Sequence, residues 1–511
     1  MTESWDAAKF TETELIQPIP KVATHVRGLD EILEGGLPEG QITAVIGGPG
    51  SGKTVLGLEF AYRSALSGEP CIFASFEERA TVIRRNALAM GWDLKPLEDA
   101  GKLFLMDSRP SLDMFRAGDY NLSGLLAILE GKAQAMGAMR LVIDSLDVIL
   151  RIFEDGVKQR DQLYYLVDWM NEKAISSILT ARSLGENDDL TSHRFLEFAT
   201  DCLIKMDFRV SGQIATRRLR VVKYRGSSYG SNEYPCIISR NGIFLLPIST
   251  MGLQQTELGR PISSGQTDID ELLGGGYRRA SSILVAGSAG TGKTTLLSTF
   301  AQAACSRGEK VLFVNFEESM EAMTSAMLSV NIDLHPFIVD GTLKMLTALP
   351  ESMGAEDHFF RAFRAIEEFR PDHVLVDAVS ATLRIDSRQA AFEYLMRLMS
   401  TCKERGITSL LSNQVGRSAS TIDQISGLGI SSLVDAILQL RYVNHGPEIK
   451  RLFLVIKSRG MAHSNQYQEF TITNHGIGLV GTYIFPIRPA ASAADIEGDL
   501  KSQPRGRREK E

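Results

Sequence analysis

Two glycine-rich segments have the residue types and spacing of a phosphate-binding loop. They read GGPGSGKT at residues 47–54 and GSAGTGKT at residues 287–294, and both fit the pattern G-x-x-x-x-G-K-[ST]. In such a loop the backbone turns tightly, so that successive N–H groups point at phosphate oxygens, and the following helix adds its positive dipole end. Each segment therefore predicts a site for a nucleoside triphosphate.

The loop residues are the expected nucleotide ligands: Gly50, Ser51, Gly52, Lys53 and Thr54 in the first loop, and Gly290, Thr291, Gly292, Lys293, Thr294 and Thr295 in the second. The loop lysines are expected to reach the β- and γ-phosphates. The hydroxyl groups of Thr54 and Thr294 are expected to ligate Mg²⁺.

An acidic residue ends one apolar segment in each half of the chain. LVID ends at Asp144 and VLVD ends at Asp377. Each segment is typical of a buried strand, and ligands of α/β proteins bind at the carboxyl ends of such strands. We therefore expect Asp144 and Asp377 to complete the two Mg²⁺ sites.

Two adjacent glutamates follow another strand-like segment in each half: Glu77 and Glu78, and Glu317 and Glu318. A carboxylate there could accept the proton of a water molecule or hydroxyl that attacks the γ-phosphate. Adjacent strand residues point to opposite faces, so one glutamate of each pair is expected to face the nucleotide. The sequence leaves open which one. A solvated acidic turn is the alternative.

A lysine and an arginine stand two positions apart in each half, as Lys223 and Arg225 in KYR and as Lys457 and Arg459 in KSR. Residues at this spacing share one face of a strand. We expect each pair to clamp the charge of a transferring phosphate from a neighbouring subunit. The alternative is an exposed basic edge.

These features occur twice because the chain is a long repeat. Residues 265–294 align with residues 25–54 without a gap, and KSRG at 457–460 aligns with KYRG at 223–226. A period this long is typical of a duplicated domain. We place the first copy at residues 1–248 and the second at 249–487, followed by a tail, 488–511, whose composition predicts disorder.

Within each copy, short apolar runs alternate with glycine-rich turns and helical stretches. This alternation predicts an α/β fold with a mostly parallel central sheet flanked by helices. Turns rich in Asn and Gly at residues 241–242 and 474–476 indicate hairpins near the end of each copy.

The composition excludes several classes of protein. The net charge of −7 and the pI near 5.8 give no general electrostatic reason to bind nucleic acid. The five cysteines are far apart and the eight histidines show no ligand spacing, so we expect neither disulfides nor a second kind of metal site. There is no signal-peptide pattern and no apolar stretch long enough to span a membrane, so we expect a cytoplasmic protein.

The tandem phosphate loops, the double FEE, the paired KxRG and the overall length together resemble the KaiC family of circadian clock proteins, in the RecA-like ATPase superfamily. The resemblance covers residues 15–487. It implies two tandem RecA-like P-loop domains, ATP as the nucleotide, and a hexamer of two stacked rings with ATP between subunits. It also implies a KaiB-like partner and, in a signalling timer, signalling kinases.

The resemblance further implies different activities for the two copies. The first ring hydrolyses ATP, and the second is an autokinase and autophosphatase acting on a Ser/Thr pair of the neighbouring subunit. That pair falls on Ser431 and Ser432, whereas the first copy has Glu197 and Phe198 there.

The sequence departs from the clock members at three places. Ser426 and Gly427 replace Thr-Asp upstream of the acceptors, Ala378 replaces a hydroxyl residue after Asp377, and the acceptors are Ser-Ser. Two other hypotheses stay open: a RecA-type ATPase acting on DNA, and an ATP-dependent hexameric scaffold without kinase activity.

Overall fold

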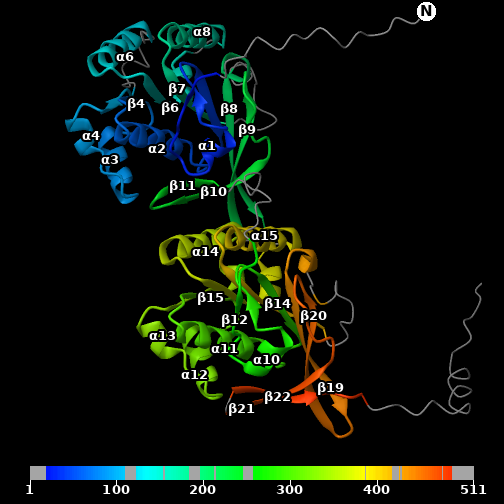
Figure 1. Ribbon diagram of the computed structural model, residues 1–511. Coiled ribbons are helices and arrows are strands. Elements are labelled where there is room, and N and C mark those ends of the chain that lie inside the picture. The colour runs from blue at the N-terminus through cyan, green and yellow to red at the C-terminus, as the bar shows by residue number, and fades with distance from the viewer. Residues whose placement is uncertain are drawn as a thin grey trace, which may run out of the picture. The chain divides into compact units, whose positions relative to one another are not determined.

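The chain forms two compact units, Met1–Gln254 and Gln255–Glu511 (Figure 1). The computed structural model describes residues 19–109, 122–153, 156–182, 196–211, 214–245, 257–385, 387–416, 425, 429–474 and 476–485. The predicted boundary at 248/249 and the predicted tail at 488–511 lie outside these residues, so both stay predictions.

Unit one is built on a nine-stranded sheet. Its strand order is β11 (Gly242–Leu245), β10 (Glu233–Ser239), β9 (Ile214–Tyr224), β8 (Cys202–Ser211), β3 (Ile42–Gly47), β7 (Ser176–Arg182), β6 (Arg140–Asp144), β4 (Cys71–Ser75) and β5 (Leu103–Asp107). The strands from β8 to β5 in this order are parallel, and β9, β10 and β11 extend the sheet as antiparallel hairpins. A separate short ribbon pairs β1 (Lys21–Val22) with β2 (Leu37–Pro38).

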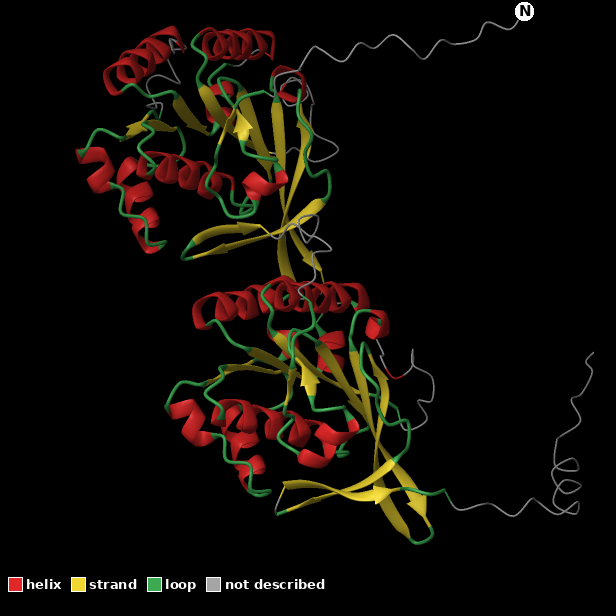
Figure 2. Cartoon of the chain, in the orientation of Figure 1, coloured by secondary structure: helices red, strands yellow, loops and turns green. Residues whose placement is uncertain are grey.

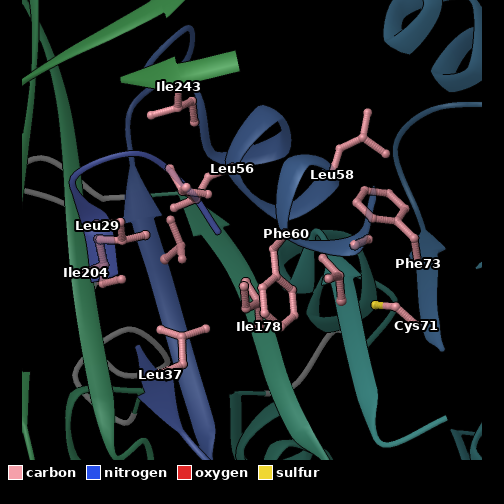
Figure 3. Packing of buried hydrophobic residues seen from close by; sticks show 14 of the residues in the cluster. Leu29, Leu37, Leu56, Leu58, Phe60, Cys71, Phe73, Ile178, Ile204 and Ile243 are labelled. Carbon is pink, nitrogen blue, oxygen red and sulfur yellow. The ribbon is translucent and has the colours of Figure 1, made fainter. Parts of the chain in front are cut away.

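Helices cover both faces of this sheet (Figure 2). They are α1 (Leu29–Ile32), α2 (Lys53–Leu66), α3 (Ala80–Ala89), α4 (Lys95–Asp99), α6 (Leu122–Met136), α7 (Leu146–Leu150) and α8 (Gly156–Glu172). The buried strands alternate their side chains between two apolar clusters, as their period of two requires. Phe73 of β4 joins the cluster around α2, which Figure 3 shows, and Ile72 joins the cluster around α6 and α8.

Unit two repeats this plan. Its strand order is β16 (Leu343–Thr347), β15 (Val311–Asn315), β17 (His373–Asp377), β18 (Thr408–Gln414), β14 (Ser282–Gly287), β19 (Ala436–His445), β20 (Glu448–Ser458), β21 (Gln468–Thr473) and β22 (Gly476–Thr482). A short ribbon pairs β12 (Pro261–Ile262) with β13 (Tyr277–Arg278).

The helices of unit two also lie on both faces of its sheet (Figure 2). They are α10 (Thr267–Leu272), α11 (Lys293–Ser306), α12 (Met320–Leu328), α13 (His335–Val339), α14 (Ala355–Phe369) and α15 (Arg388–Glu404), with the 3₁₀ turns η2 (Pro350–Ser352), η3 (Val379–Arg384) and η4 (Ile430–Ser432). Two α/β units with mostly parallel nine-stranded sheets confirm the predicted fold class, and the two predicted terminal hairpins are present as β10–β11 and β21–β22.

No helix among the described residues is long and apolar enough to cross a membrane. All five cysteines are buried with free thiols.

Candidate active sites

Each predicted phosphate loop connects the central strand of its sheet to a helix. In unit one β3 ends at Gly47 and α2 begins at Lys53, and in unit two β14 ends at Gly287 and α11 begins at Lys293. The glycine before each lysine has a positive φ, 107° at Gly52 and 105° at Gly292. A Cβ atom would lie 2.6 Å from Ile238 Cδ1 at the first and 2.5 Å from Ile472 Cδ1 at the second. Both positions therefore require glycine.

The loop lysines lie over the backbone of their own loops. Lys53 Nζ donates to the carbonyl oxygens of Gly47 at 2.8 Å and Gly48 at 3.0 Å, and Lys293 Nζ donates to that of Ser288 at 3.0 Å. Burial lowers the pKa of both lysines, and nearby carboxylates oppose this shift. Each lysine thus brings a partly desolvated positive charge to its loop.

The predicted Mg²⁺ ligands are paired in both units. Thr54 Oγ1 lies 3.3 Å from Asp144 Oδ1, and Thr294 Oγ1 lies 2.6 Å from Asp377 Oδ2. Burial raises the pKa of Asp144, which a bound cation would oppose. A hydroxyl beside a carboxylate at the start of a P-loop helix is a donor set that fits Mg²⁺.

The remaining predicted loop residues complete the turn or begin the helix. Ser51 and Thr291 are fully buried, Thr295 is buried within α11, and Gly50 and Gly290 have positive φ. The structure therefore brings every predicted loop residue to one end of its sheet.

The first glutamate of the first pair faces the loop. Glu77 lines a cavity of about 440 Å³ together with Lys53, Thr54 and Asp144. Its Oε1 accepts a hydrogen bond of 2.7 Å from Ser145 Oγ. Glu78 instead accepts a hydrogen bond of 3.3 Å from Asn86 of α3.

In unit two, Glu317 is the glutamate that lies near the loop charges. Burial raises the pKa of Glu317, Asp377 raises it further, and Lys293 partly opposes the shift. Ala378 occupies the position of Ser145 and is fully buried. Among the described residues no hydrogen bond to the Glu317 carboxylate is found, and the only bond of Glu318 is from its backbone N–H to Asn315.

Sequence reasoning missed two arginines and two aromatic residues beside the loops. Arg217 Nε donates to the carbonyl oxygen of Gly50 at 3.0 Å, and its guanidinium lies 4.5 Å from the Phe208 ring. In unit two, Tyr442 Oη donates to the carbonyl oxygen of Gly290 at 2.5 Å, and Arg451 lies 5.4 Å from its ring. The repeat could have pointed to these residues, since an aromatic residue and an arginine recur in both copies at the same sequence separation that relates KYRG to KSRG.

Arg182 was missed as well. It ends β7 and lines the cavity of Lys53 and Glu77, and its backbone N–H donates to Asp147 at 2.7 Å. The matching position at the end of β18 is Gln414, whose backbone N–H donates a hydrogen bond of 3.1 Å to Ser380 Oγ. The first site therefore has a charged side chain that the second lacks.

The Lys/Arg pair of unit two lies beside the predicted acceptors of its own chain. Lys457 Nζ donates to the carbonyl oxygens of Ser431 and Val434, each at 2.7 Å. Arg459 Nη2 donates to that of Ser432 at 2.9 Å. Burial lowers the pKa of Lys457, and Arg459 lowers it further.

Unit one makes the same contacts without the serines. Lys223 Nζ donates to the carbonyl oxygens of Glu197 at 2.8 Å and Thr200 at 2.5 Å, and Arg225 Nη2 donates to that of Phe198 at 2.7 Å. The Lys/Arg clamp, by which we mean these bonds to backbone carbonyl oxygens, is thus present in both copies. Serine hydroxyl groups at the clamped positions occur only in the second copy.

The predicted acceptor serines, Ser431 and Ser432, lie at the edge of the sheet opposite the phosphate loop of their own unit. They form η4, with Ser431 partly buried and Ser432 exposed, and the chain then enters β19. Because β19 runs parallel to β14, the start of β19 lies beside the start of β14, whereas the loop follows the end of β14. Six residues of strand separate the two edges, about 20 Å. Ser426 and Gly427 lie outside the described residues.

A model of the KaiC ATPase family matches residues 22–250 and 262–482, one stretch in each unit. The chain belongs to the KaiC family. It is 36% identical over 467 residues to the circadian clock protein KaiC2 of Synechocystis sp. (strain ATCC 27184 / PCC 6803 / Kazusa), covering 91% of this chain and 82% of that protein. It is 32% identical over 508 residues to the circadian clock oscillator protein KaiC of Picosynechococcus sp. (strain ATCC 27264 / PCC 7002 / PR-6), covering 97% of each.

Membership of the KaiC family identifies ATP as the nucleotide of the two phosphate loops. Two KaiC ATPase domains in one chain imply that both units bind ATP and that the chain is a two-domain ATPase.

Proposed function

We propose that this KaiC-family ATPase is a serine autokinase and autophosphatase that assembles as a hexamer of two stacked rings. In the proposed assembly, unit one hydrolyses ATP, and unit two transfers the γ-phosphoryl group to Ser431 or Ser432 of the neighbouring subunit. The relatives' names support a role in a circadian clock, and a role in another signalling timer belongs to the same proposal. A KaiB-like partner, signalling kinases and a cytoplasmic location belong to the same proposal.

The observation that carries the kinase proposal is the position of the acceptors relative to the loop. Ser431 and Ser432 lie at one edge of the sheet and Lys293 begins the helix at the other, about 20 Å away. A hydroxyl oxygen must come within about 3.5 Å of the phosphorus atom that it attacks. This separation argues against transfer within one folded subunit and supports transfer from the ATP of a neighbour.

The chain's own residues support each part of the transfer. Glu317, whose pKa burial raises, is suited to accept the proton of the attacking serine hydroxyl. The serine oxygen forms a bond to the γ-phosphorus as the bond to the bridging oxygen breaks, which leaves ADP. Lys293 stabilises the charge on the phosphoryl oxygens. Mg²⁺, held by Thr294 and Asp377, would neutralise charge on the β- and γ-phosphates.

Unit one has the residues for hydrolysis and lacks an acceptor. Glu77 lies in the cavity of Lys53 and Asp144, where it is suited to orient and deprotonate a water molecule. Glu197 and Phe198 occupy the positions of the two serines. Water is then the nucleophile in unit one.

The test is the mass of the full-length protein after incubation with Mg-ATP. We expect added phosphate in the wild type, none in a Ser431→Ala/Ser432→Ala double variant, and wild-type incorporation in Ser329→Ala, which removes an exposed hydroxyl of the same unit. Wild-type protein that assembles with ATP but gains no phosphate would contradict the kinase proposal and favour the scaffold. Phosphate retained by the double variant would place the acceptor elsewhere.

A further inference from the structure

The segment that carries the two serines, residues 431–435, is held by three cationic side chains. Lys457 and Arg459 bind the carbonyl oxygens of residues 431, 432 and 434. The carbonyl oxygen of Leu433 accepts a hydrogen bond of 3.1 Å from Nζ of Lys403. Four consecutive backbone carbonyl groups are therefore bound by charged donors. The third of these donors, Lys403, has no part in the transfer proposed above.

Lys403 belongs to the last turn of α15 and is tied to the sheet through Asp435. Its Nζ lies 3.2 Å from Asp435 Oδ2, and the two side chains are 12% and 7% exposed. The same Oδ2 accepts a hydrogen bond of 2.9 Å from the backbone N–H of Ser282, the first residue of β14. An ammonium group that is largely removed from water needs such partners, because its desolvation is otherwise costly.

This third cation is specific to unit two. Helices α8 and α15 each contain 17 residues and occupy matching positions before β7 and β18. At the position of Lys403, α8 has Asn171, which is exposed. The Lys/Arg clamp is thus common to both copies, and the additional lysine occurs in the copy that has the serines.

The segment has little regular structure of its own to fix it. The 3₁₀ turn η4 contains three residues, and its backbone bonds run from Leu433 N and Val434 N to the carbonyl oxygen of Ile430, at 2.9 and 3.2 Å. A single turn is only marginally stable in isolation. The charged contacts of the side chains therefore add to the order that the full burial of Ile430 and Val434 supplies.

We infer that Lys403 is a positioning residue for phosphoryl transfer: by binding Leu433 and Asp435 it fixes the segment so that the hydroxyl groups of Ser431 and Ser432 are presented to the neighbour's ATP in one orientation. The inference rests on the proposed autokinase function. Lys403 touches no reacting atom, and its effect passes through the backbone of the segment. A nucleophile misplaced by about 1 Å loses on the order of a hundredfold in rate.

The test compares Lys403→Gln with Lys403→Arg, which keeps the charge, and with Lys450→Gln. The last variant breaks another partly buried pair, Lys450 to Glu469 at 2.9 Å, on β20 away from the serines. We expect Lys403→Gln to lower the phosphorylation rate about tenfold or more, with an unchanged KM for ATP and unchanged ATP hydrolysis by unit one. Lys403→Arg should recover most of the rate, and Lys450→Gln should behave as wild type.

Amide hydrogen exchange gives a second, independent measurement. Exchange of the Leu433 and Val434 N–H groups should accelerate in Lys403→Gln and not in Lys450→Gln. Wild-type phosphorylation and exchange in Lys403→Gln would overturn the inference while leaving the proposed function intact. A parallel loss of ATP binding, hydrolysis and phosphorylation would also overturn it, because it would show a general structural role. A wild-type protein that gains no phosphate would overturn the proposed function itself.

Discussion

The hydroxyl oxygen of Ser145 lies 2.7 Å from Oε1 of Glu77, and the second copy has no such contact because Ala378 replaces the serine. The two predicted bases therefore differ in their surroundings, although their sequences match. A hydroxyl that donates to a carboxylate stabilises its charged form. Glu317 lacks this donor, and burial beside Asp377 raises its pKa.

Restoring the hydroxyl should change the pH dependence of phosphorylation. A base acts in its charged form, so activity is lost as pH falls through its pKa. In Ala378→Ser the new hydroxyl should lower the pKa of Glu317, and the acidic limb of the pH–rate profile should move to lower pH. Phosphate incorporation measured over a pH series checks this. Ala381→Ser is the control, because Ala381 is also a buried alanine and lies in η3, which directly follows Ala378, and an equal shift in it would contradict the explanation.

The two loop lysines should separate the two activities. Lys293→Ala removes the charge beside Asp377 and should lower phosphate incorporation by about a hundredfold or more. Lys53→Ala should lower ATP hydrolysis by a similar factor. It should leave phosphate incorporation in place, because the loop of the second copy is unchanged. Hydrolysis is measured as released phosphate and incorporation by protein mass. Equal loss of both activities in each variant would show that the copies do not act separately.

The hydroxyl of Tyr442 should contribute to ATP binding by the second copy. It donates to the carbonyl oxygen of Gly290 at 2.5 Å, which restrains the phosphate loop. One such hydrogen bond contributes about 1 kcal/mol, so Tyr442→Phe should raise the KM for ATP in phosphorylation by about fivefold. Tyr394→Phe is the matched control, because that buried hydroxyl has no hydrogen-bond partner among the described residues. An unchanged KM in Tyr442→Phe would contradict the prediction.

A buried histidine should make unit two sensitive to acid. His373 Nε2 lies 3.0 Å from Glu309 Oε2, and Arg279 and Arg307 also bind this carboxylate. Burial lowers the pKa of His373 below its ordinary value, although Glu309 opposes the shift. Below about pH 6.5, His373 therefore binds a proton more readily in the unfolded chain than in the folded protein. The free energy of unfolding decreases as pH falls through that range.

The check is the midpoint of thermal unfolding of full-length protein between pH 7.5 and 5. We expect a smaller decrease in His373→Gln than in the wild type. His335→Gln, which removes an exposed histidine of the same unit, should follow the wild type. Identical pH dependence in wild type and His373→Gln would show that His373 does not control it.

Much of both candidate sites could be predicted because their residues follow strands and loops in a fixed order. The pairing of Thr54 with Asp144 follows from one P-loop and one strand end, and the parallel sheet brings both to the same edge. Which glutamate lies beside the phosphate loop could not be predicted, since the backbone bends after β4 ends at Ser75 and the alternation of the strand stops before Glu77. The stacking of Arg217 on Phe208 was also out of reach, because it depends on the register of two antiparallel strands.

The sequence by itself determined that this chain is a duplicated α/β nucleotide-binding protein, because phosphate loops and buried strands are local patterns that each copy repeats. Only the tertiary structure decided that Lys457 and Arg459 bind the backbone of residues 431–434, and that these residues lie a full strand length from the phosphate loop of their own unit. The physical reason is that strand pairing sets these distances. Residues far apart in the sequence, such as Lys403 and Asp435, become neighbours only when the sheet and helix α15 pack together.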